Sequence, residues 1–265
     1  PGAAGRFPWL LLTAAFVVVA ALLSLLVLRG AGSAAPPSAA SASAGSPTRP
    51  PLDNAVQATV QILTPDDSRA GSYSLGSGSV VDADGYILTN FHVIGATDSG
   101  ELYNTRGDIW IGIAPSGSTQ PPVVRYRAEV VEADRTLDLA LLHIVGTPGG
   151  GDLPAGLRLS ALPIGDSDSV QIGDPISVLG YPGLGGDTLT VTSGSVAGFL
   201  PGWIKTDAET NQGNSGGAAV NAAGELIGVP TAGYSEVGDS EHMPGKIGLI
   251  RPINQARALL EKIKR

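Results

Sequence analysis

The sequence contains no cysteine, a single methionine and few aromatic residues among its 265 positions. The absence of cysteine excludes thiol catalysis, cysteine-ligated zinc and disulfide bonds, so a folded domain must be stabilised by its hydrophobic core alone. Long amphipathic helical patterns are also scarce, whereas glycine and proline are abundant, with 37 and 20 residues. Short apolar segments separated by turn-forming residues are typical of an all-β protein.

Positive charge is in the minority. The chain has 16 Lys and Arg residues against 24 Asp and Glu residues, and its net charge is −8. No acidic residue precedes Asp53, so the part of the chain that follows is more acidic than the whole. Nucleic acids and anionic membrane surfaces bind positively charged surfaces, and we therefore expect no nucleic-acid partner.

The one long apolar segment lies near the N-terminus, at residues 7–28, and contains no charged residue. As an α-helix this segment would be about 33 Å long, which is enough to cross the hydrocarbon core of a bilayer. A cleaved signal peptide has a shorter apolar region of roughly 7–15 residues, although the small residues at 42–44 provide a cleavage-like pattern. We therefore predict a single transmembrane anchor over residues 1–29 and a disordered Ala/Ser/Pro linker over residues 30–51.

The remaining domain, residues 52–265, alternates between short apolar segments and turns. Six strands are expected over 55–63, 73–82, 86–90, 107–114, 123–133 and 139–145. Six more are expected over 174–180, 188–198, 203–207, 217–221, 225–231 and 246–250. Two such sets fit two small β-barrels. The Gly- and Pro-rich segment 146–156 marks the boundary between a first lobe of about 52–150 and a second lobe of about 151–250.

The sequence predicts one convincing helix in this domain, over residues 252–264. Pro252 suits a first helical turn, and basic residues near the end complement the helix dipole. Apolar residues recur on one face at helical spacing, namely Ile253, Ala256, Leu259, Leu260 and Ile263. The predicted fold class is therefore all-β, with two six-stranded barrels and a C-terminal helix.

A glycine-framed serine in Asn-Gln-Gly-Asn-Ser-Gly-Gly, residues 211–217, is the most informative feature of the chain. Glycines on both sides of Ser215 allow a tight turn that exposes its hydroxyl, with backbone N–H groups converging on an oxygen anion. A serine hydroxyl is a weak nucleophile and needs a histidine base, which in turn needs a carboxylate to orient it. The same glycine–serine–glycine spacing occurs in α/β-hydrolases, but the alternation of strands and helices in that fold is absent here.

Only three histidines, His92, His143 and His242, are available as the base. His92 follows a strand-like segment, whereas His143 lies inside an apolar segment and His242 lies in a loop rich in Gly, Ser and acidic residues. Asp138 opens an apolar segment, where a partly buried carboxylate gains from pairing with an imidazole N–H. We therefore predict that His92, Asp138 and Ser215 meet in one site.

The sequence resembles the HtrA/Deg family of trypsin-like serine proteases at four stretches that occur in the family order. They are TNFHVI (89–94), DLALLHI (138–144), IGDSDSVQIGDPISVLGYPG (164–183) and TDAETNQGNSGGAAVNAAGELIGV (206–229). The resemblance implies a double β-barrel with Ser215 as nucleophile, His92 as general base and then acid, and Asp138 as the orienting carboxylate. It also implies an oxyanion hole formed by the N–H groups of Gly213 and Ser215, with Asn214 shaping the loop between them.

The resemblance further implies hydrolysis of peptide bonds through an acyl-enzyme, without a metal or organic cofactor. The expected substrates are exported or unfolded polypeptides, and the expected location is the extracytoplasmic side of the cell membrane. Family members are often homotrimers and usually carry PDZ domains after the protease, but none is expected within this chain.

Primary specificity is predicted from the residue six positions before the nucleophile, which lies near the pocket base in trypsin-like folds. That residue is Glu209, followed by Thr210, so a preference for basic side chains is one hypothesis. The alternative to an active protease is a catalytically silent or partner-gated binding or chaperone module on the same fold, and a third reading is a structural anchor.

Overall fold

The structure, a computed structural model, describes residues 50–69, 71–104, 106–115, 120–182, 188–231 and 247–263. The predicted transmembrane anchor and all but the last two residues of the predicted linker lie outside these residues. In the part of the chain that is described, no helix is both long and apolar enough to cross a membrane.

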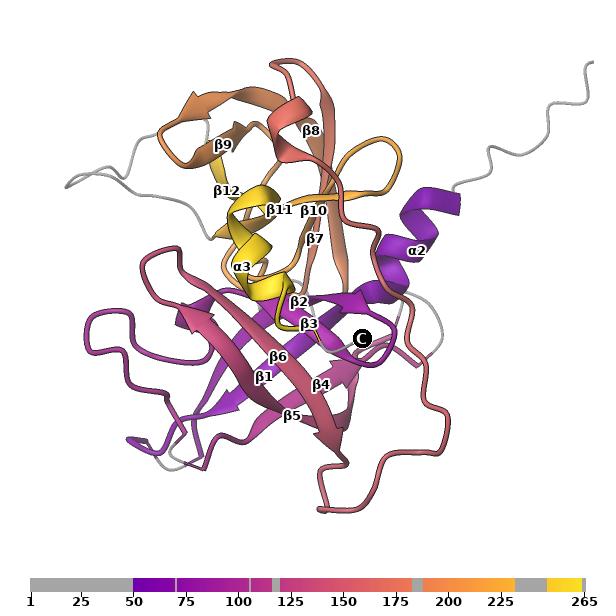
Figure 1. The fold of residues 1–265 in the computed structure, drawn as a ribbon, viewed down its shortest axis with the longest axis vertical. Helices are drawn as coiled ribbons and strands as arrows, with labels where there is room; N and C mark the ends of the chain where they lie inside the picture. The colour runs from indigo at the N-terminus through magenta and orange to yellow at the C-terminus, as the bar shows by residue number, and fades with distance from the viewer. Residues whose placement is uncertain are drawn as a thin grey trace, which may run out of the picture. The chain divides into compact units, whose positions relative to one another are not determined.

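The first half of the described chain forms a closed, antiparallel, six-stranded barrel (Figure 1). Its strands are β1 (Thr59–Pro65), β2 (Tyr73–Asp82), β3 (Tyr86–Thr89), β4 (Ile109–Ile113), β5 (Val123–Asp134) and β6 (Leu139–Gly146). They follow one another around the barrel in the order β1-β2-β3-β6-β5-β4, and pairing of β1 with β4 closes the ring. Branched apolar side chains such as Ile62, Ile87 and Leu141 are fully buried inside it.

The second half forms another closed barrel of six strands. They are β7 (Pro175–Gly180), β8 (Thr190–Leu200), β9 (Trp203–Thr206), β10 (Ala218–Val220), β11 (Leu226–Thr231) and β12 (Gly248–Pro252). Their order is β10-β11-β12-β9-β8-β7, and pairing of β10 with β7 closes this ring. The two closed barrels confirm the prediction of an all-β double barrel, with the connection between them running over residues 147–174.

Helix α2 (Pro50–Ala58) precedes β1, so the predicted strand 55–63 is wrong in its first four residues. Two prolines in the first turn and an acidic residue near the positive end of the helix dipole favour a helix there. Ala55 is fully buried, and the Thr59 hydroxyl donates to the Ala55 carbonyl at 2.8 Å where helix gives way to strand. The predicted linker 30–51 also extends too far, because its last two residues belong to α2.

The C-terminal helix is confirmed but is shorter than the predicted 252–264. It consists of the 3₁₀ helix η3 (Ile253–Ala256) and the α-helix α3 (Arg257–Leu260). The predicted apolar face is buried at its centre, where Leu259 is 3% exposed. Residues 261–263 form a turn instead of continuing the helix.

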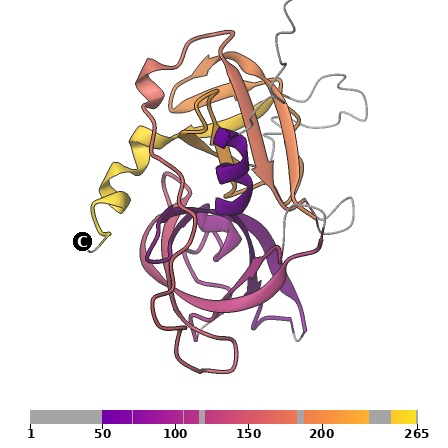
Figure 2. The same ribbon diagram turned by 90° about the vertical axis from the view of Figure 1, so that its right-hand side faces the viewer.

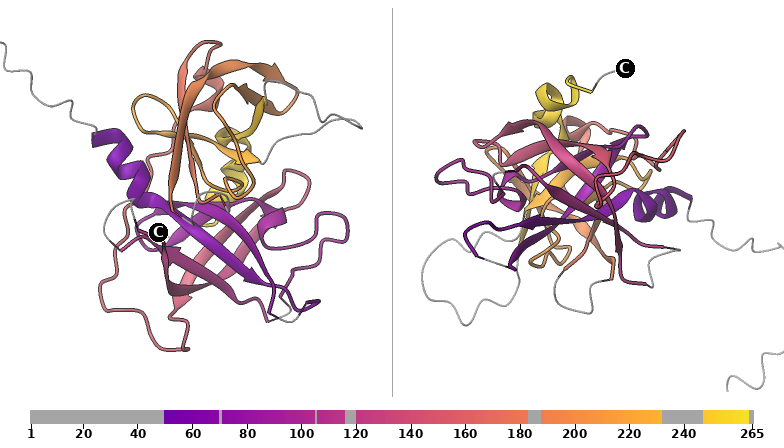
Figure 3. Two further views of the ribbon diagram at one scale, coloured as in Figure 1. Left: turned by 180° about the vertical axis from the view of Figure 1, so that it is seen from behind. Right: turned by 90° about the horizontal axis from the view of Figure 1, so that it is seen from below.

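Helices α2 and α3 contact the first barrel at different places. Helix α2 packs on β1 and β2, whereas α3, which follows the second barrel, packs on β6. The views in Figure 2 and Figure 3 show α2 and α3 on different sides of the junction between the barrels. Lys262, just after α3, lies 3.3 Å from Glu132 of β5. After the second barrel, the chain therefore packs again on the first barrel.

Candidate active site

His92 lies in the short 3₁₀ helix η1 (Phe91–Val93), directly after β3. The side chains of Phe91 and Val93 are buried in the first barrel. Anchoring of both neighbours turns the intervening imidazole outwards, and 35% of the His92 side chain is exposed. The sequence around this histidine thus presents its ring at the edge of the barrel.

Asp138 lies in the turn before β6 and contacts His92 through both carboxylate oxygens. Its Oδ2 lies 2.7 Å from His92 Nδ1, and its Oδ1 accepts a hydrogen bond from the His92 backbone N–H at 2.9 Å. A carboxylate only accepts hydrogen bonds, so the neutral imidazole that suits this contact carries its proton on Nδ1 and its lone pair on Nε2. Asp138 has a φ of 54°, in the left-handed region that short polar residues tolerate better than most.

Ser215 lies in the turn between β9 and β10 of the second barrel and is 3% exposed. Its carbonyl accepts a hydrogen bond from the backbone N–H of Ser77 in β2 at 2.9 Å. The next residue, Gly216, donates its N–H to the Pro230 carbonyl at 3.0 Å. The serine turn is therefore hydrogen-bonded to strands of both barrels.

Gly216 brings the serine turn against the histidine turn. Its φ is 82°, and a Cβ atom there would overlap the Ser77 carbonyl oxygen and the Thr89 hydroxyl. The same atom would lie 3.0 Å from the backbone nitrogen of Asn90. Thr89 and Asn90 lead directly into η1, so both the backbone conformation and the close approach require glycine at this position.

Asn90 is a residue of the site that sequence reasoning missed. Its Nδ2 donates to the Asp138 carbonyl at 2.8 Å and to Thr231 Oγ1 at 3.3 Å. One buried amide thus connects the histidine turn, the aspartate turn and β11 of the second barrel. The sequence offers one signal for Asn90: it is a polar residue directly after an apolar strand and directly before the Phe-His pair.

The predicted oxyanion hole consists of the backbone N–H groups of Gly213 and Ser215. Gly213 has a φ of 104°, which glycine adopts without strain. The N–H of Asn214, between them, donates to the Asn211 carbonyl at 2.9 Å. The Asn214 side chain is buried, and neither of its amide atoms has a hydrogen-bond partner among the described residues. The turn is therefore held through its main-chain atoms and not through the Asn214 side chain.

The two residues predicted at the specificity pocket have different environments. Glu209 is exposed, and its carboxylate accepts a hydrogen bond from Asn211 Nδ2 at 3.0 Å. Thr210 is 4% exposed and packs so closely on Gly248 that a Cβ atom there would lie 2.6 Å from its methyl group. Thr210, and not Glu209, is therefore the buried member of the pair.

The other histidines are not part of this arrangement in the described structure. His143 stacks on Tyr86, with ring centroids 4.3 Å apart and an interplanar angle of 23°. His143 is therefore a packed, partly exposed histidine of strand β6. His242 lies outside the described residues.

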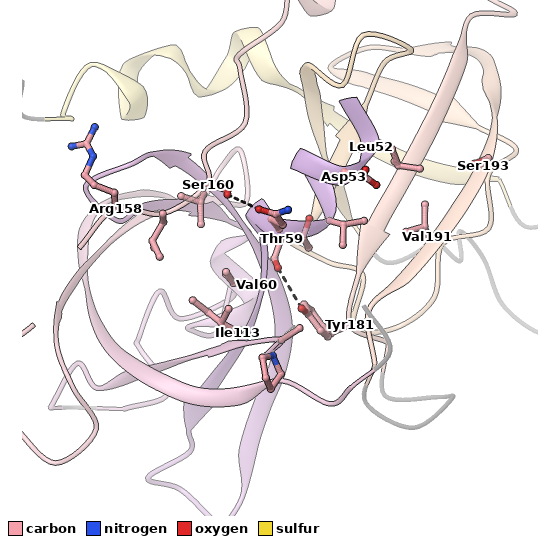
Figure 4. Close-up of a pocket in the computed structure, with 16 residues that line it drawn as sticks. Leu52, Asp53, Thr59, Val60, Ile113, Arg158, Ser160, Tyr181, Val191 and Ser193 are labelled. Carbon is pink, nitrogen blue, oxygen red and sulfur yellow. Dashed lines mark hydrogen bonds between the residues drawn. The ribbon is translucent and has the colours of Figure 1, made fainter. Parts of the chain in front are cut away.

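A separate hollow of about 910 Å³ lies between α2, the open end of the first barrel and β8 (Figure 4). It is lined by apolar side chains such as Val60 and Ile113 and by polar ones such as Gln57 and Ser160. None of His92, Asp138 or Ser215 borders it. Tyr181 forms part of its wall, with its hydroxyl 3.4 Å from the Thr59 carbonyl.

Among the described residues, no three His, Asp or Glu side chains are grouped to hold a metal ion.

The charge of Asp138 affects the pKa values of two other ionisable groups, Tyr103 and Arg251. Burial raises the pKa of Tyr103, and nearby carboxylates, Asp138 among them, raise it further. Burial lowers the pKa of Arg251, whose guanidinium lies 3.5 Å from the Trp203 ring centroid, while Asp138 acts in the opposite direction. The electrostatic influence of Asp138 therefore extends beyond its contact with the histidine.

Comparison with known proteins gives a match to the trypsin-like peptidase domain over residues 76–229. The magnetosome formation protease MamE of Magnetospirillum gryphiswaldense is 36% identical over 194 residues, which are 69% of this chain and 22% of MamE. The serine endoprotease DegS of Escherichia coli is 32% identical over 199 residues, 72% of this chain and 49% of DegS. The periplasmic pH-dependent serine endoprotease DegQ of Escherichia coli is 33% identical over 210 residues, 75% of this chain and 39% of DegQ.

These comparisons confirm the resemblance drawn from the four sequence stretches. The matched region contains the turns that carry His92, Asp138 and Ser215. The chain spans about half or less of the length of these curated relatives. They also rule out the α/β-hydrolase interpretation of the glycine-framed serine, in agreement with the two closed barrels.

Proposed function

Because the chain belongs to the trypsin-like peptidase family, we propose that it is a serine endopeptidase of the HtrA/Deg type. In this proposal Ser215 is the nucleophile, His92 the general base and Asp138 the residue that orients it. The observation that supports the proposal most strongly is the double contact between Asp138 and His92. One carboxylate oxygen binds the backbone N–H of the histidine and the other binds Nδ1, so the ring is held with Nε2 available as base.

In the reaction, His92 Nε2 takes the proton from the Ser215 hydroxyl as its oxygen attacks the carbonyl carbon of the substrate. Asp138 stabilises the imidazolium that forms. The carbonyl oxygen becomes an anion and is bound by the N–H groups of Gly213 and Ser215. Collapse of this intermediate breaks the C–N bond, and His92 gives the proton to the leaving amine. Water then attacks the acyl-enzyme by the same route, with the histidine acting again as base and then acid.

For specificity, we propose that Thr210 lies at the base of the pocket for the side chain before the scissile bond. Its burial against Gly248 favours small or medium uncharged side chains. The hypothesis drawn from the sequence, a basic preference set by Glu209, makes the opposite prediction. Cleavage of a peptide library by wild type and Glu209→Ala decides between them: equal turnover of Arg and Val substrates by both proteins would exclude a role for Glu209.

The proposed location is the extracytoplasmic side of a membrane, with residues 7–28 as a single anchor and exported or unfolded polypeptides as substrates. The support is the uncharged apolar segment in the sequence and the periplasmic location in the name of DegQ. A homotrimer is the assembly that the family resemblance implies. Cross-linking of the full chain in detergent, followed by mass measurement, tests this assembly.

The activity is tested with the purified full chain, a fluorophosphonate probe and casein. The wild type should be labelled at Ser215 and should degrade casein, whereas Ser215→Ala and His92→Ala should lose casein cleavage by about 10³-fold or more. His143→Ala is the matched control, because it removes a histidine stacked on Tyr86 and should retain both activities.

The pattern of results separates the alternatives. Labelling without casein cleavage would indicate a protease that a partner or assembly must activate. An unlabelled wild type would contradict the proposal and favour a binding or chaperone module on the same fold.

A further inference from the structure

We propose that Ser77 is a positioning residue whose hydroxyl holds the peptide group between Gly213 and Asn214, and through it the oxyanion hole. Ser77 lies in β2 of the first barrel, far from Gly213 in the sequence. The inference rests on the proposed function, since it assigns a task to the same site. Sequence reasoning did not single out this serine.

The Ser77 side chain is fully buried, and its hydroxyl makes two short hydrogen bonds. Oγ donates to the Gly213 carbonyl at 2.7 Å and accepts from the Tyr181 backbone N–H at 2.8 Å. The donor and one acceptor site of the hydroxyl are therefore both used. Through them Ser77 connects the serine turn with the segment that follows β7.

The backbone of Ser77 is bound in the same region. Its N–H donates to the Ser215 carbonyl at 2.9 Å, and its carbonyl accepts from the Thr89 hydroxyl at 2.7 Å. Ser77 thus contacts the serine turn at two carbonyls, on either side of Asn214, and contacts the end of β3 that leads to the histidine turn.

These contacts matter because the peptide group between Gly213 and Asn214 is held at both ends. Its oxygen is bound by Ser77 Oγ, and its N–H donates to the Asn211 carbonyl at 2.9 Å. The neighbouring peptide groups on each side carry the two N–H groups proposed to bind the oxyanion. Their directions follow from the torsion angles at residues 213 and 214 relative to this fixed plane.

The hydrogen bond from Ser77 is needed at this point because Gly213 is conformationally permissive. With a φ of 104°, it occupies a region from which a residue without Cβ rotates at little cost. The Asn214 side chain has no hydrogen-bond partner in the described structure that could limit such rotation. Replacing Ser77 by alanine would leave the Gly213 carbonyl and the Tyr181 N–H without their bonds in a buried place.

The test compares Ser77→Ala with Ser79→Ala in the full chain. Ser79 is two residues further along β2, is also fully buried, and its hydroxyl has no hydrogen-bond partner among the described residues. Both variants lose one buried hydroxyl from the same strand, but only Ser77→Ala loses the hydrogen bonds to Gly213 and Tyr181. We expect Ser77→Ala to lower kcat by about tenfold without changing KM, and Ser79→Ala to leave both unchanged.

A second readout separates positioning from a general structural effect. A peptidyl trifluoromethyl ketone forms a hemiketal with the nucleophile, and its oxygen takes the place of the oxyanion. Ser77→Ala should weaken this inhibitor by about the same factor as it lowers kcat. In a Ser215→Ala background, binding of an uncleaved substrate peptide should not change. Ser77→Cys, whose somewhat larger thiol donates a weaker hydrogen bond, should lie between alanine and wild type.

Three outcomes would overturn the inference while the proposed function stands: an active wild type with unchanged kcat in Ser77→Ala, an equal loss in Ser79→Ala, or equal weakening of the ketone and the uncleaved peptide. If Ser77→Ala does not fold, as shown by its circular dichroism, Ser77→Cys decides in its place, and wild-type affinity of that variant for the ketone overturns the inference. An unlabelled, inactive wild type would overturn the proposed function and this inference together.

Discussion

Asp138 performs two tasks at the residue scale, because it binds both the backbone and the ring of His92. The backbone bond positions the histidine turn, and the ring bond selects the tautomer. An asparagine at this position would still offer one oxygen, but its NH₂ group would meet either the N–H of the backbone or that of Nδ1. The two tasks are therefore incompatible with an amide, although its shape is nearly that of the carboxylate.

The substitution Asp138→Asn should accordingly lower kcat by about 10⁴-fold, because the imidazole is forced into the wrong tautomer or orientation. Steady-state kinetics with a chromogenic peptide measures the effect. Asp98→Asn removes an exposed carboxylate from the same barrel and should leave kcat unchanged. Substantial activity in Asp138→Asn would show that the histidine does not depend on this carboxylate.

Gly216 is the residue on which the approach of the two barrels depends most directly. Gly216→Ala places a methyl group against Ser77 and Thr89 and forces a positive φ on alanine, so we expect a loss of about 2–4 kcal/mol in unfolding free energy. Urea denaturation followed by tryptophan fluorescence measures it. The control is Gly149→Ala, since an added Cβ there has no neighbour within 4 Å. Equal stability of the two variants would contradict the packing described here.

The strands show, at the scale of elements, what could be predicted from the sequence. All twelve were expected near their observed places, because short apolar segments between Gly, Pro and Asp residues leave few alternatives. Helix α2 was missed because Pro50 and Pro51 resemble the linker before them and Val56 resembles the strand after them. Tertiary packing favours the helix over a longer strand. Ala55 and Ala58 are fully buried, and their small side chains let α2 approach the barrel closely.

The same limit applies to the site. His92, Asp138 and Ser215 were predicted from local chemistry, because each is an unusual polar residue at the end of an apolar segment or between glycines. Ser77 and Asn90 were not, since their roles depend on contacts across 136 and 141 residues of chain. No local pattern distinguishes Ser77 from Ser79, although one hydroxyl is doubly bonded and the other is not.

Tyr181, which follows β7 and packs against the start of β1, should make the unfolding free energy depend on pH. Burial raises the pKa of Tyr181 to about 12, above the ordinary value of 10.0, so the folded state favours the neutral phenol. Its contribution to stability is present in full below pH 10 and is lost as pH rises towards about 12. Unfolding free energies from urea titrations on either side of pH 10 should fall less in Tyr181→Phe than in wild type. An identical decline in both would show that this phenol does not titrate on unfolding.

At the scale of the whole molecule, each barrel supplies one part of the proposed machinery. The first barrel holds the base and its carboxylate, and the second holds the nucleophile and the oxyanion turn. The bonds from Ser77 to Gly213, from Ser77 to Ser215 and from Asn90 to Thr231 cross between them. The proposed activity is therefore a property of how the barrels dock, and α3, which returns from the second barrel to β6, adds to that docking.

The most direct measurement is a crystal structure of the full chain with a peptidyl trifluoromethyl ketone bound. The account predicts a covalent bond from Ser215 Oγ to the ketone carbon and hydrogen bonds from the Gly213 and Ser215 N–H groups to the former ketone oxygen. It also predicts His92 Nε2 within about 3.2 Å of Ser215 Oγ. A ligand bound elsewhere, or a His92 ring remote from the serine oxygen in the complex, would contradict it.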